Sequence, residues 1–222
     1  MLLFAGLILT ISVLIVQAVS DEKVVTGRAS YYGIGFHGKK TANGEIYNKY
    51  LFTAAHRKYK FGTYVNVRNI KNGLSITVRI NDRGPYNYSR IIDLSEAAAR
   101  RIGSYAHGLT MVEIQPVRMI RITPEIEEIF ACNDVVDCLG NAESLGKYSI
   151  SLYNTKDLIH MIYISNELYL HEDVEKVYIA SRGDGKNKNY HLLISDFKNE
   201  KEMLKAKDYF ERKGFMQVSV FK

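Results

Sequence analysis

The sequence has no tryptophan, only three prolines and only two cysteines among its 222 residues, and these shortages narrow the class of protein. Cys132 and Cys138 lie close together, but no second Cys or His pair is near them, which excludes the common two-pair zinc site. A small disulfide loop in an oxidising compartment and free thiols in a reducing one both stay open. Without Trp, the 16 Tyr residues supply the half-polar contact surface for a polar polymer, although half-buried strands account for most of them equally well.

Charged side chains are absent from the first stretch, Met1–Val19, which is almost wholly apolar. The run ends in small residues before Asp21, so we interpret residues 1–20 as a secretory signal cleaved after Ser20. Its first residues carry no Lys or Arg, and the run is near the length that spans a bilayer, so an uncleaved inner-membrane anchor is the alternative. The stretch has no cysteine, which excludes lipid attachment there. Either way we expect the rest of the chain to be exported.

The composition is that of an ordinary globular protein, with 46% hydrophobic and 24% charged residues and a net charge of +6. The positive charge is concentrated between residues 27 and 117, which hold 14 Lys and Arg against 5 Asp and Glu. This excess indicates an anionic partner at that surface. Nucleic acid is disfavoured, because the basic residues are scattered and no nucleic-acid motif accompanies them.

Residues 27–117 read as a first domain of short strands separated by glycine-rich turns. The expected strands are 27–32, 64–69, 74–80, 91–94 and 111–117, and Asn72-Gly73 predicts a hairpin between two of them. One helix is expected over Ser95–Ile102, with Gly103 at its end. Asp93 or Ser95 can cap it, and Asp93 has capping-box spacing to Glu96. Many short strands with one short helix predict a small closed barrel.

A second domain is expected over residues 147–222. The segment 118–146 has 2 basic against 6 acidic residues, and this shift in composition identifies it as a linker. After it, patterning predicts strands at 148–153, 174–180, 190–197 and 215–221, with helices at 156–170 and 200–213. This β-α-β-β-α-β order is a two-fold repeat of a β-α-β unit. The predicted fold class is therefore mainly β plus α+β: a barrel followed by a small α+β domain.

The stretch Ile80–Pro85 holds the residue around which the first domain is organised. An alternating, β-branched run stops at Asn81, and Gly84-Pro85 then forces a turn. Asp82 is thereby held in a fixed direction at the end of a strand, where scaffolds often carry their chemistry. The alternative is that Asp82 only caps the turn with its own side chain.

Several segments of the first domain match one known family in order. They are Gly27–Gly33, Phe36–Glu45, Thr53–Arg57, Phe61–Thr63, Asn81–Pro85 and Arg90–Ala98. Together they resemble the RlpA-like, six-stranded double-psi β-barrel of septal lytic transglycosylases, and residues 147–222 resemble a SPOR domain, which in that family binds glycan strands stripped of stem peptides. The chain departs from the family at Tyr32, where many members have Trp, and at Tyr59-Lys60, where Leu-Pro is usual. Many relatives also carry a lipid-attachment cysteine.

The resemblance implies an endolytic transglycosylase of the periplasm and division septum. Such an enzyme cleaves the β-1,4 bond between N-acetylmuramic acid (MurNAc) and N-acetylglucosamine (GlcNAc) in denuded strands and forms 1,6-anhydro-MurNAc. Because the sugar's own C6 hydroxyl attacks, one carboxyl group can donate a proton and later take one back. Asp82 is the matched acid/base, and Arg83 should point away from it, since a general acid needs a raised pKa.

Other residues take supporting roles in this interpretation. Glu45 is expected to stabilise the oxocarbenium ion or orient the sugar, with a loop hydrogen-bonding role as its alternative. His56 either orients Asp82 and binds substrate or is an ordinary, partly buried histidine. The remaining expected substrate-binding residues are Tyr32, Thr41, Asn43 and Arg83.

Further expectations complete the interpretation. Asp93 is expected to be a helix cap and not a catalyst. His37 and His107 lack the spacing of metal ligands, so no metal or other cofactor is expected. We expect a monomer whose partner is peptidoglycan. The rival interpretation is a non-catalytic wall-binding protein comparable to the expansins.

Overall fold

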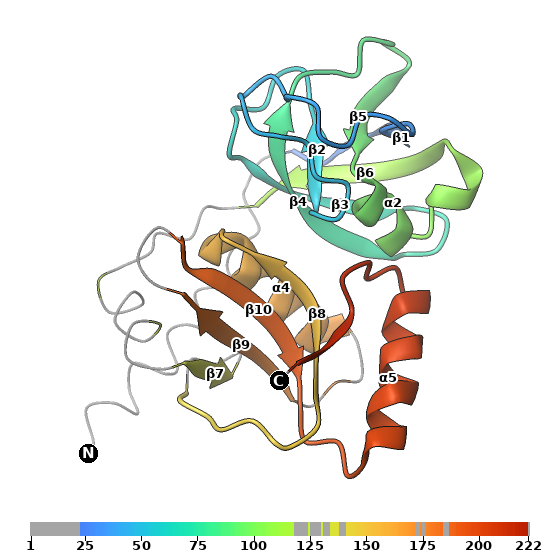
Figure 1. Cartoon of the computed structure of the whole chain (residues 1–222). Helices are drawn as coiled ribbons and strands as arrows, with labels where there is room; N and C mark the ends of the chain where they lie inside the picture. The colour runs from blue at the N-terminus through green and yellow to red at the C-terminus, as the bar shows by residue number, and fades with distance from the viewer. Residues whose placement is uncertain are drawn as a thin grey trace. The chain divides into compact units, whose positions relative to one another are not determined.

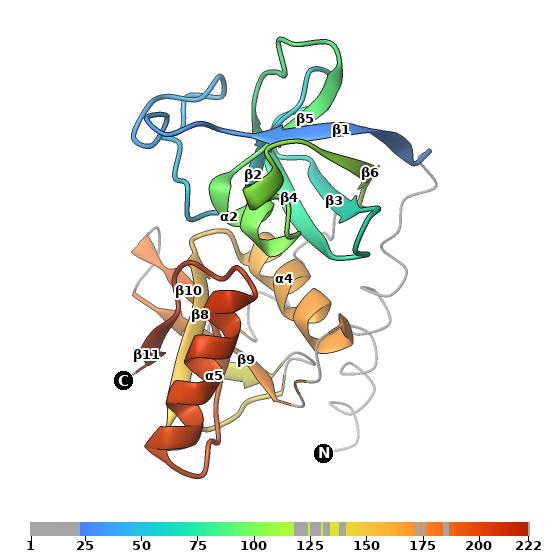
Figure 2. The same ribbon diagram turned by 90° about the vertical axis from the view of Figure 1, so that its right-hand side faces the viewer.

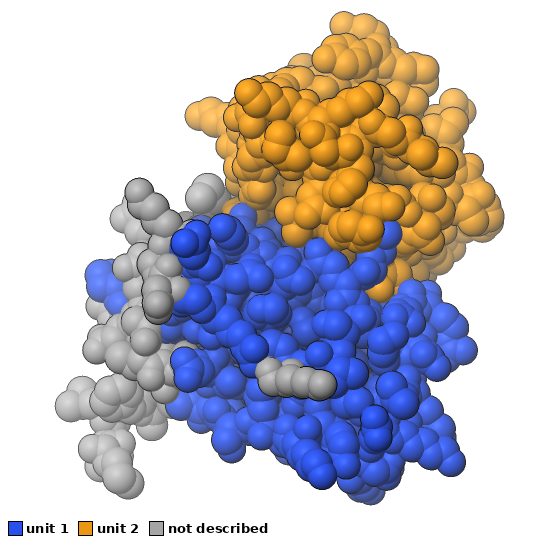
Figure 3. Space-filling model, viewed as in Figure 1, with its two compact units in different colours: residues 1–18, 120–212, 216–222 blue, residues 19–119, 213–215 orange. Residues whose placement is uncertain are grey.

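The chain divides into two compact units, shown in different colours in Figure 3. The computed structural model describes residues 23–117, 124, 130, 134–137, 141–171, 174, 176–183 and 187–221. Among these, residues 23–117 and 213–215 form the first unit in chain order (orange, marked unit 2 in Figure 3), and the others form the second (blue, marked unit 1). The first unit contains the basic segment, and the second contains the predicted α+β domain.

The first unit is a closed barrel of six strands (Figures 1 and 2). The strands are β1 (Val25–Tyr31), β2 (Thr53–Ala55), β3 (Tyr64–Asn69), β4 (Ser75–Asp82), β5 (Arg90–Leu94) and β6 (Thr110–Pro116). They lie in the order β1-β5-β2-β4-β3-β6. The pairs β1·β5 and β2·β4 are parallel and the other pairs are antiparallel. The predicted six-stranded barrel is thus confirmed.

The barrel core is built from alternate residues of these strands, as the pleat of a strand requires. In β4 the inward series is Ile76, Val78 and Ile80, which are at most 1% exposed. The other strands add fully buried apolar side chains: Val65, Val67, Ile92, Leu94, Val112 and Ile114. Each such side chain stabilises the fold by about 1.5–3 kcal/mol relative to exposure. The outward residues are therefore free to carry the site.

Local signals explain most of these elements. The Asn72-Gly73 hairpin between β3 and β4 is confirmed: Gly73 has φ 75°, a conformation that favours glycine, and its N–H donates to the Asn69 carbonyl at 2.8 Å. Strand β2 was not predicted, because three residues are too few to show a period. It is placed by pairing with β4 on one side and β5 on the other.

Helix α2 (Glu96–Arg101) lies where a helix was predicted, but its cap corrects one expectation. Ser95 is the N-cap residue, because its hydroxyl accepts a hydrogen bond from the Ala98 N–H at 3.2 Å. Asp93 instead lies inside β5 and caps nothing. Ser95 and not Asp93 forms the cap because Ser95 directly precedes the first helical residue. A short 3₁₀ helix, η1 (Tyr105–His107), then leads to β6.

In the described part of the chain, the second unit contains a five-stranded sheet with the helices α4 and α5 (Figure 1). Its main elements are β8 (Ser149–Thr155), α4 (Leu158–His171), β9 (Val177–Arg182), β10 (Asn189–Ile194), α5 (Glu200–Arg212) and β11 (Ser219–Phe221). The predicted β-α-β-β-α-β order is confirmed. The strand order is β11-β8-β10-β9-β7, with all neighbours antiparallel, which is a split β-α-β arrangement.

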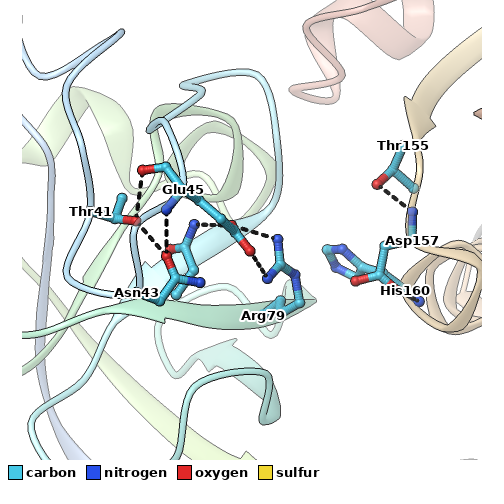
Figure 4. Close-up of polar contacts among 8 residues, drawn as sticks. Thr41, Asn43, Glu45, Arg79, Thr155, Asp157 and His160 are labelled. Carbon is cyan, nitrogen blue, oxygen red and sulfur yellow. Dashed lines mark hydrogen bonds and ion pairs between the residues drawn. The ribbon is translucent and has the colours of Figure 1, made fainter. Parts of the chain in front are cut away.

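Helices α4 and α5 each begin at a side-chain cap. The Asp157 carboxylate accepts from the His160 N–H at 3.0 Å at the start of α4, and the Asp157 N–H donates to the Thr155 hydroxyl at 3.2 Å (Figure 4). Asn199 accepts from the Glu202 N–H at 3.0 Å at the start of α5. Each cap satisfies an N–H group that has no partner within the helix.

The predicted linker 118–146 contributes a strand to the second unit. Strand β7 (Val135–Asp137) pairs with β9, so the sheet begins before the expected boundary at residue 147. Three residues in an acidic segment gave no strand signal. The leader 1–20, Cys132 and Cys138 lie outside the described residues. Within the described part of the chain, no helix is long and apolar enough to cross a membrane.

Candidate active site

A β-bulge at the end of β4 directs Asp82 out of the barrel. Ala54 pairs with Ile80, but the next residue, Ala55, pairs with Asp82, so Asn81 is the extra residue of the bulge. Without it, Asp82 would follow Ile80 at the two-residue spacing and face the core. The bulge reverses this direction, as bulges next to active sites commonly do. The apolar interior therefore ends at Ile80, two residues before the carboxylate.

Three neutral donors fix the Asp82 carboxylate. The Tyr32 hydroxyl donates to Oδ2 at 2.7 Å, while the Ala42 and Arg83 N–H groups each donate to Oδ1 at 2.8 Å. Burial, followed by the hydrogen bond to Asp82, raises the pKa of Tyr32 far above its usual value, so Tyr32 stays protonated and remains a donor. Asp82 is thus oriented from three directions by groups that carry no charge.

The Arg83 side chain is directed to a neighbouring loop. Its guanidinium donates to the carbonyls of His56 at 3.2 Å and Tyr59 at 2.9 Å, and it lies 3.7 Å from the centre of the Phe61 ring. This is the orientation expected from the sequence, in which the cation points away from Asp82. These contacts brace the loop after β2, and the substrate-binding role of Arg83 stays a prediction.

Glu45 has a different environment (Figure 4). Its carboxylate receives two hydrogen bonds from the Arg79 guanidinium, at 2.8 and 2.9 Å, and one from the Asn81 amide at 3.0 Å. These contacts, with Arg79 as the main cause, lower the pKa of Glu45 from 4.5 to about 2. Bidentate Arg–carboxylate pairs are strong and directional. Glu45 therefore stays ionised and is held on β4.

The loop that carries Glu45 is fastened to the bulge. The Thr41 hydroxyl donates to Asn43 Oδ1 at 2.7 Å, and the Glu45 N–H donates to the same oxygen at 3.0 Å (Figure 4). The Asn43 N–H reaches the Asn81 carbonyl at 3.3 Å. Thr41 and Asn43, both predicted to bind substrate, thus shape the loop whose Ala42 N–H holds Asp82.

His56 is a neutral imidazole with a defined tautomer. Its Nδ1 accepts from the N–H groups of Lys58 at 3.2 Å and Tyr59 at 2.9 Å, which leaves the proton on Nε2. Burial, together with the charges of neighbouring Arg57, Arg83 and Lys58, lowers the pKa of His56 to about 4. Its ring stacks on Tyr59 at 4.0 Å. His56 can donate a hydrogen bond near neutral pH but does not supply a charge.

These contacts bring the seven predicted site residues together at the end of β4. His56 is joined to this group by its own N–H, which donates to the Asp82 carbonyl at 3.2 Å. Two exposed rings that the sequence did not single out adjoin them. Phe36 packs on Tyr32 with 5.6 Å between ring centres, and Phe61 lies beneath Arg83. Phe36 and Phe61 are 47% and 39% exposed, and this exposure cannot be read from the sequence.

Metal binding finds no support among the described residues, in which no group of three or more His, Cys, Asp or Glu side chains is arranged to hold an ion. His37 accepts a hydrogen bond from the Lys49 N–H at 3.3 Å through Nδ1. The groups that these contacts place at the site are two carboxylates, a phenol and a neutral imidazole.

Comparisons with known proteins agree with this geometry. Residues 24–114 match the model of the lytic transglycolase family. The chain is similar to the probable endolytic peptidoglycan transglycosylase RlpA of Synechocystis, with 50% identity over 101 residues, 46% of this chain and 32% of the relative. It is also 50% identical over 96 residues to the endolytic peptidoglycan transglycosylase RlpA of Neisseria meningitidis serogroup A, over 43% of this chain and 40% of the relative.

A third relative extends the similarity beyond the barrel. The endolytic peptidoglycan transglycosylase RlpA of Helicobacter pylori strain 26695 is 36% identical over 195 residues, which cover 84% of this chain and 60% of the relative. The chain thus spans between about a third and three fifths of the length of these relatives. The fold and the family match define residues 24–114 as a double-psi β-barrel of the lytic transglycolase class. Within that class, the barrel is RlpA-like. The SPOR resemblance of residues 147–222 stays a prediction.

Proposed function

We propose that this chain is an exported, endolytic peptidoglycan transglycosylase. It cleaves the β-1,4 bond between MurNAc and GlcNAc and leaves a 1,6-anhydro-MurNAc end. The observation that carries the proposal is the Asp82 carboxylate, which the bulge at Asn81 turns out of the barrel and which neutral donors alone orient. A carboxyl group without a cationic partner can take up and release a proton during the reaction. The names of the relatives agree with this chemistry.

Asp82 acts twice in the proposed reaction. In its acid form it gives a proton to the glycosidic oxygen as the bond to C1 of MurNAc breaks. The C6 hydroxyl of the same sugar then attacks C1, and its proton is taken up by the Asp82 carboxylate, which has just given up its own proton. No water is consumed, so no separate group has to activate one. A positioned acid/base typically contributes roughly 10²–10⁴-fold to a rate.

The neighbours of Asp82 orient the carboxyl group and the sugar. Tyr32 stays protonated and holds Oδ2, and the Glu45–Arg79 pair keeps the Ala42 N–H on Oδ1. His56 offers its Nε2–H to a sugar hydroxyl. Phe36 and Phe61 supply exposed ring faces on which pyranose rings can lie.

The basic excess of residues 27–117 favours an anionic polymer, and the substrate in this proposal is a strand from which the stem peptides have been removed. Removal of a stem peptide leaves the lactyl carboxylate of MurNAc free, so a denuded strand carries one negative charge per disaccharide. A basic surface attracts such a polymer. In the same proposal the second unit, with its β-α-β-β-α-β order, holds the enzyme on denuded glycan at the division septum.

Mass spectrometry of the products from purified peptidoglycan tests the cleavage. We expect anhydro-ended fragments from within strands, each lighter by one water than the corresponding hydrolysis product. Hydrolysis products would replace the transglycosylase proposal with a hydrolase. Tight binding to peptidoglycan without any product would favour the expansin-like, non-catalytic alternative.

Fluorescence localisation of a truncated chain tests the role of the second unit. The cut belongs after Val117, because β7 already forms part of the second sheet. We expect the truncated protein to lose its septal position while it keeps its activity on soluble denuded strands. Persistent septal rings would show that the barrel itself carries the localisation signal.

A further inference from the structure

Two tyrosines of the barrel differ from the other tyrosines of the chain in their exposure. All 16 tyrosines lie within the described residues. Tyr86 and Tyr88 are 88% and 85% exposed, whereas the next most exposed, Tyr169 and Tyr209, are 43% and 40% exposed. Half-buried strand positions, which account for many tyrosines in proteins, therefore do not account for Tyr86 and Tyr88.

Both tyrosines lie in loop 85–89, which joins β4 to β5 and projects from the barrel (Figures 1 and 2). The loop turns at Asn87, whose carbonyl accepts from the Arg90 N–H at 3.1 Å. The side-chain oxygen of Asn87 also accepts from the Ser89 N–H at 2.9 Å. Asn side chains commonly stabilise turns through such local hydrogen bonds. The backbone that carries the two tyrosines thus has a defined conformation.

Arg57, in the loop after β2, fixes both ends of loop 85–89. Its Nη1 donates to the Pro85 carbonyl at 2.9 Å and to the Arg90 carbonyl at 2.8 Å. Hydrogen bonds from a charged donor are stronger than neutral ones. The Arg57 Cζ also lies 5.2 Å from the centre of the Tyr88 ring, which is within the range of a cation–π contact. The loop and one of its rings are therefore held in place before any ligand binds.

The loop begins next to the proposed acid. Gly84 is buried, and a Cβ atom on it would lie 3.7 Å from the methyl group of Ala55, so the start of the loop packs on the end of β2. Tyr86 and Tyr88 follow Asp82 by four and six residues, so their Cα atoms lie at most roughly 14 and 22 Å from that of Asp82. A polymer that is bound at Asp82 can therefore extend to both rings.

We propose that Tyr86 and Tyr88 form a remote sugar-binding surface, on which the glycan strand packs at a distance from the bond that is cleaved. The proposal rests on the transglycosylase function inferred above and names positioning residues for its substrate. A pyranose ring has an apolar face that can pack on an exposed aromatic ring, and the tyrosine hydroxyl can bond to its polar edge. The positive charge of Arg57 beside Tyr88 attracts the lactyl carboxylates of a denuded strand.

The properties of the loop suit binding better than they suit folding. An apolar side chain stabilises the fold only when it is removed from water, so Tyr86 and Tyr88 contribute little to stability. A loop that is already ordered loses little entropy when a ligand binds to it. Sugars bound there can supply energy that orients the strand at Asp82. Bonds inside a long strand should therefore be cleaved more efficiently than bonds in short strands that do not reach the loop.

The first test measures kcat/KM of the full chain on soluble denuded strands of increasing length, with anhydro ends as readout. The double variant Tyr86→Ser, Tyr88→Ser should lose roughly two- to tenfold for each ring on long strands, the fold-change of one aromatic contact, and nothing on the shortest strands that are cleaved. Ile70→Ser is the matched control, because it removes an exposed apolar side chain from the hairpin at the other end of β4. Wild-type kcat/KM for the double variant on long strands, or an equal loss at every length, would overturn the proposal.

The second test detects the contact directly and does not need the tyrosine variants to fold. Nitration followed by peptide mass spectrometry measures how fast each tyrosine is modified, and the Asp82→Asn chain is used so that the strands stay intact. We expect denuded strands to slow the nitration of Tyr86 and Tyr88 in proportion to the fraction of protein bound. Dextran is the control polymer and should leave both rates unchanged. Equal rates with and without saturating denuded strands would contradict the proposal.

The two tests also separate this proposal from the function on which it rests. If the wild-type protein makes no anhydro ends, the transglycosylase is rejected, and protection of Tyr86 and Tyr88 would then identify a strand-binding surface without catalysis. An active wild-type protein with unprotected tyrosines and an unimpaired double variant rejects only the remote sugar-binding surface.

Discussion

Two neighbouring regions of the barrel each present a carboxylate, and they differ in the charge of its partners. In loop 41–45, Glu45 is bound by the Arg79 guanidinium, which fixes both its position and its ionised state. At the end of β4, Asp82 is bound by a phenol and two backbone N–H groups. A carboxylate that is paired with a cation stays ionised and holds its segment in place, because protonating it would break the pair. Neutral donors orient a carboxylate and leave its proton exchange free.

Asp82→Asn is expected to have the largest effect on cleavage of the substitutions that test this comparison. The amide keeps the shape and two of the hydrogen-bonding directions but carries no transferable acid proton. We expect cleavage to fall by at least about a thousandfold, within the range of a positioned acid/base, while Tm and strand binding stay near wild type. The measurement is the rate at which anhydro ends form from denuded strands. Anhydro ends produced at the wild-type rate by Asp82→Asn would move the chemistry away from β4.

Glu45→Gln tests the other side of the comparison. The amide cannot keep the charge-assisted pair with Arg79, so the loop that supplies the Ala42 N–H should loosen. Small displacements of an orienting group can cost on the order of 10²-fold, so we expect a loss of about tenfold to a hundredfold. The same assay measures it, with Glu113→Gln, which removes an exposed ion pair with Arg68, as the surface control. If Glu45→Gln were more damaged than Asp82→Asn, Glu45 and not Asp82 would be the acid.

Much of the fold was predictable because its signals are local. The Asn72-Gly73 turn, the alternation along β4 and the alanines of α2 each encode structure within a few residues. Strands β2 and β7 are three residues long and are placed by partners distant in the sequence, which no local pattern reveals. The bulge at Asn81 was likewise hidden, because a bulge is defined by the register of two strands.

The site residues likewise divide into those that the local sequence predicts and those that depend on distant partners. Asp82 was predictable because a turn directly follows it. The engagement of Glu45 by Arg79 joins residues 34 positions apart. The strand register that aligns Ser30, Asp93, Ala55 and Asp82 joins residues of four strands. For Asp93 the local signal was misleading, since its capping-box spacing to Glu96 has no counterpart in the structure, where Ser95 forms the cap. Residue types were readable from the sequence, whereas their partners depended on the closed barrel.

Tyr32→Phe sharpens the comparison by removing one neutral donor from Asp82 without removing a charge. The ring can keep its packing on Tyr47 and Phe36, so the fold should be preserved. A hydrogen bond to a charged group is worth about 1.5–3 kcal/mol, and at the lower end of this range we expect kcat to fall about tenfold. Tyr47→Phe provides the matched control, because it removes a nearby phenol that bonds to the Glu96 N–H and not to Asp82. Equal losses in the two variants would indicate a general packing effect.

The smallest effect concerns stability against pH. Because the pKa of Glu45 is lowered from 4.5 to about 2, its pair with Arg79 stabilises the folded barrel fully above pH 4.5 and progressively less as the pH falls towards 2. Glu45→Gln lacks this contribution at every pH, so the Tm difference between wild type and variant should shrink across that window. Since 41% of the Glu45 side chain is exposed, solvent screens the pair and the shift should be only on the order of a few degrees. Thermal unfolding of both proteins from pH 7 to pH 2 measures this Tm difference. A difference that stayed constant over the whole range would mean that the charge of the Glu45 carboxylate does not hold its loop in place.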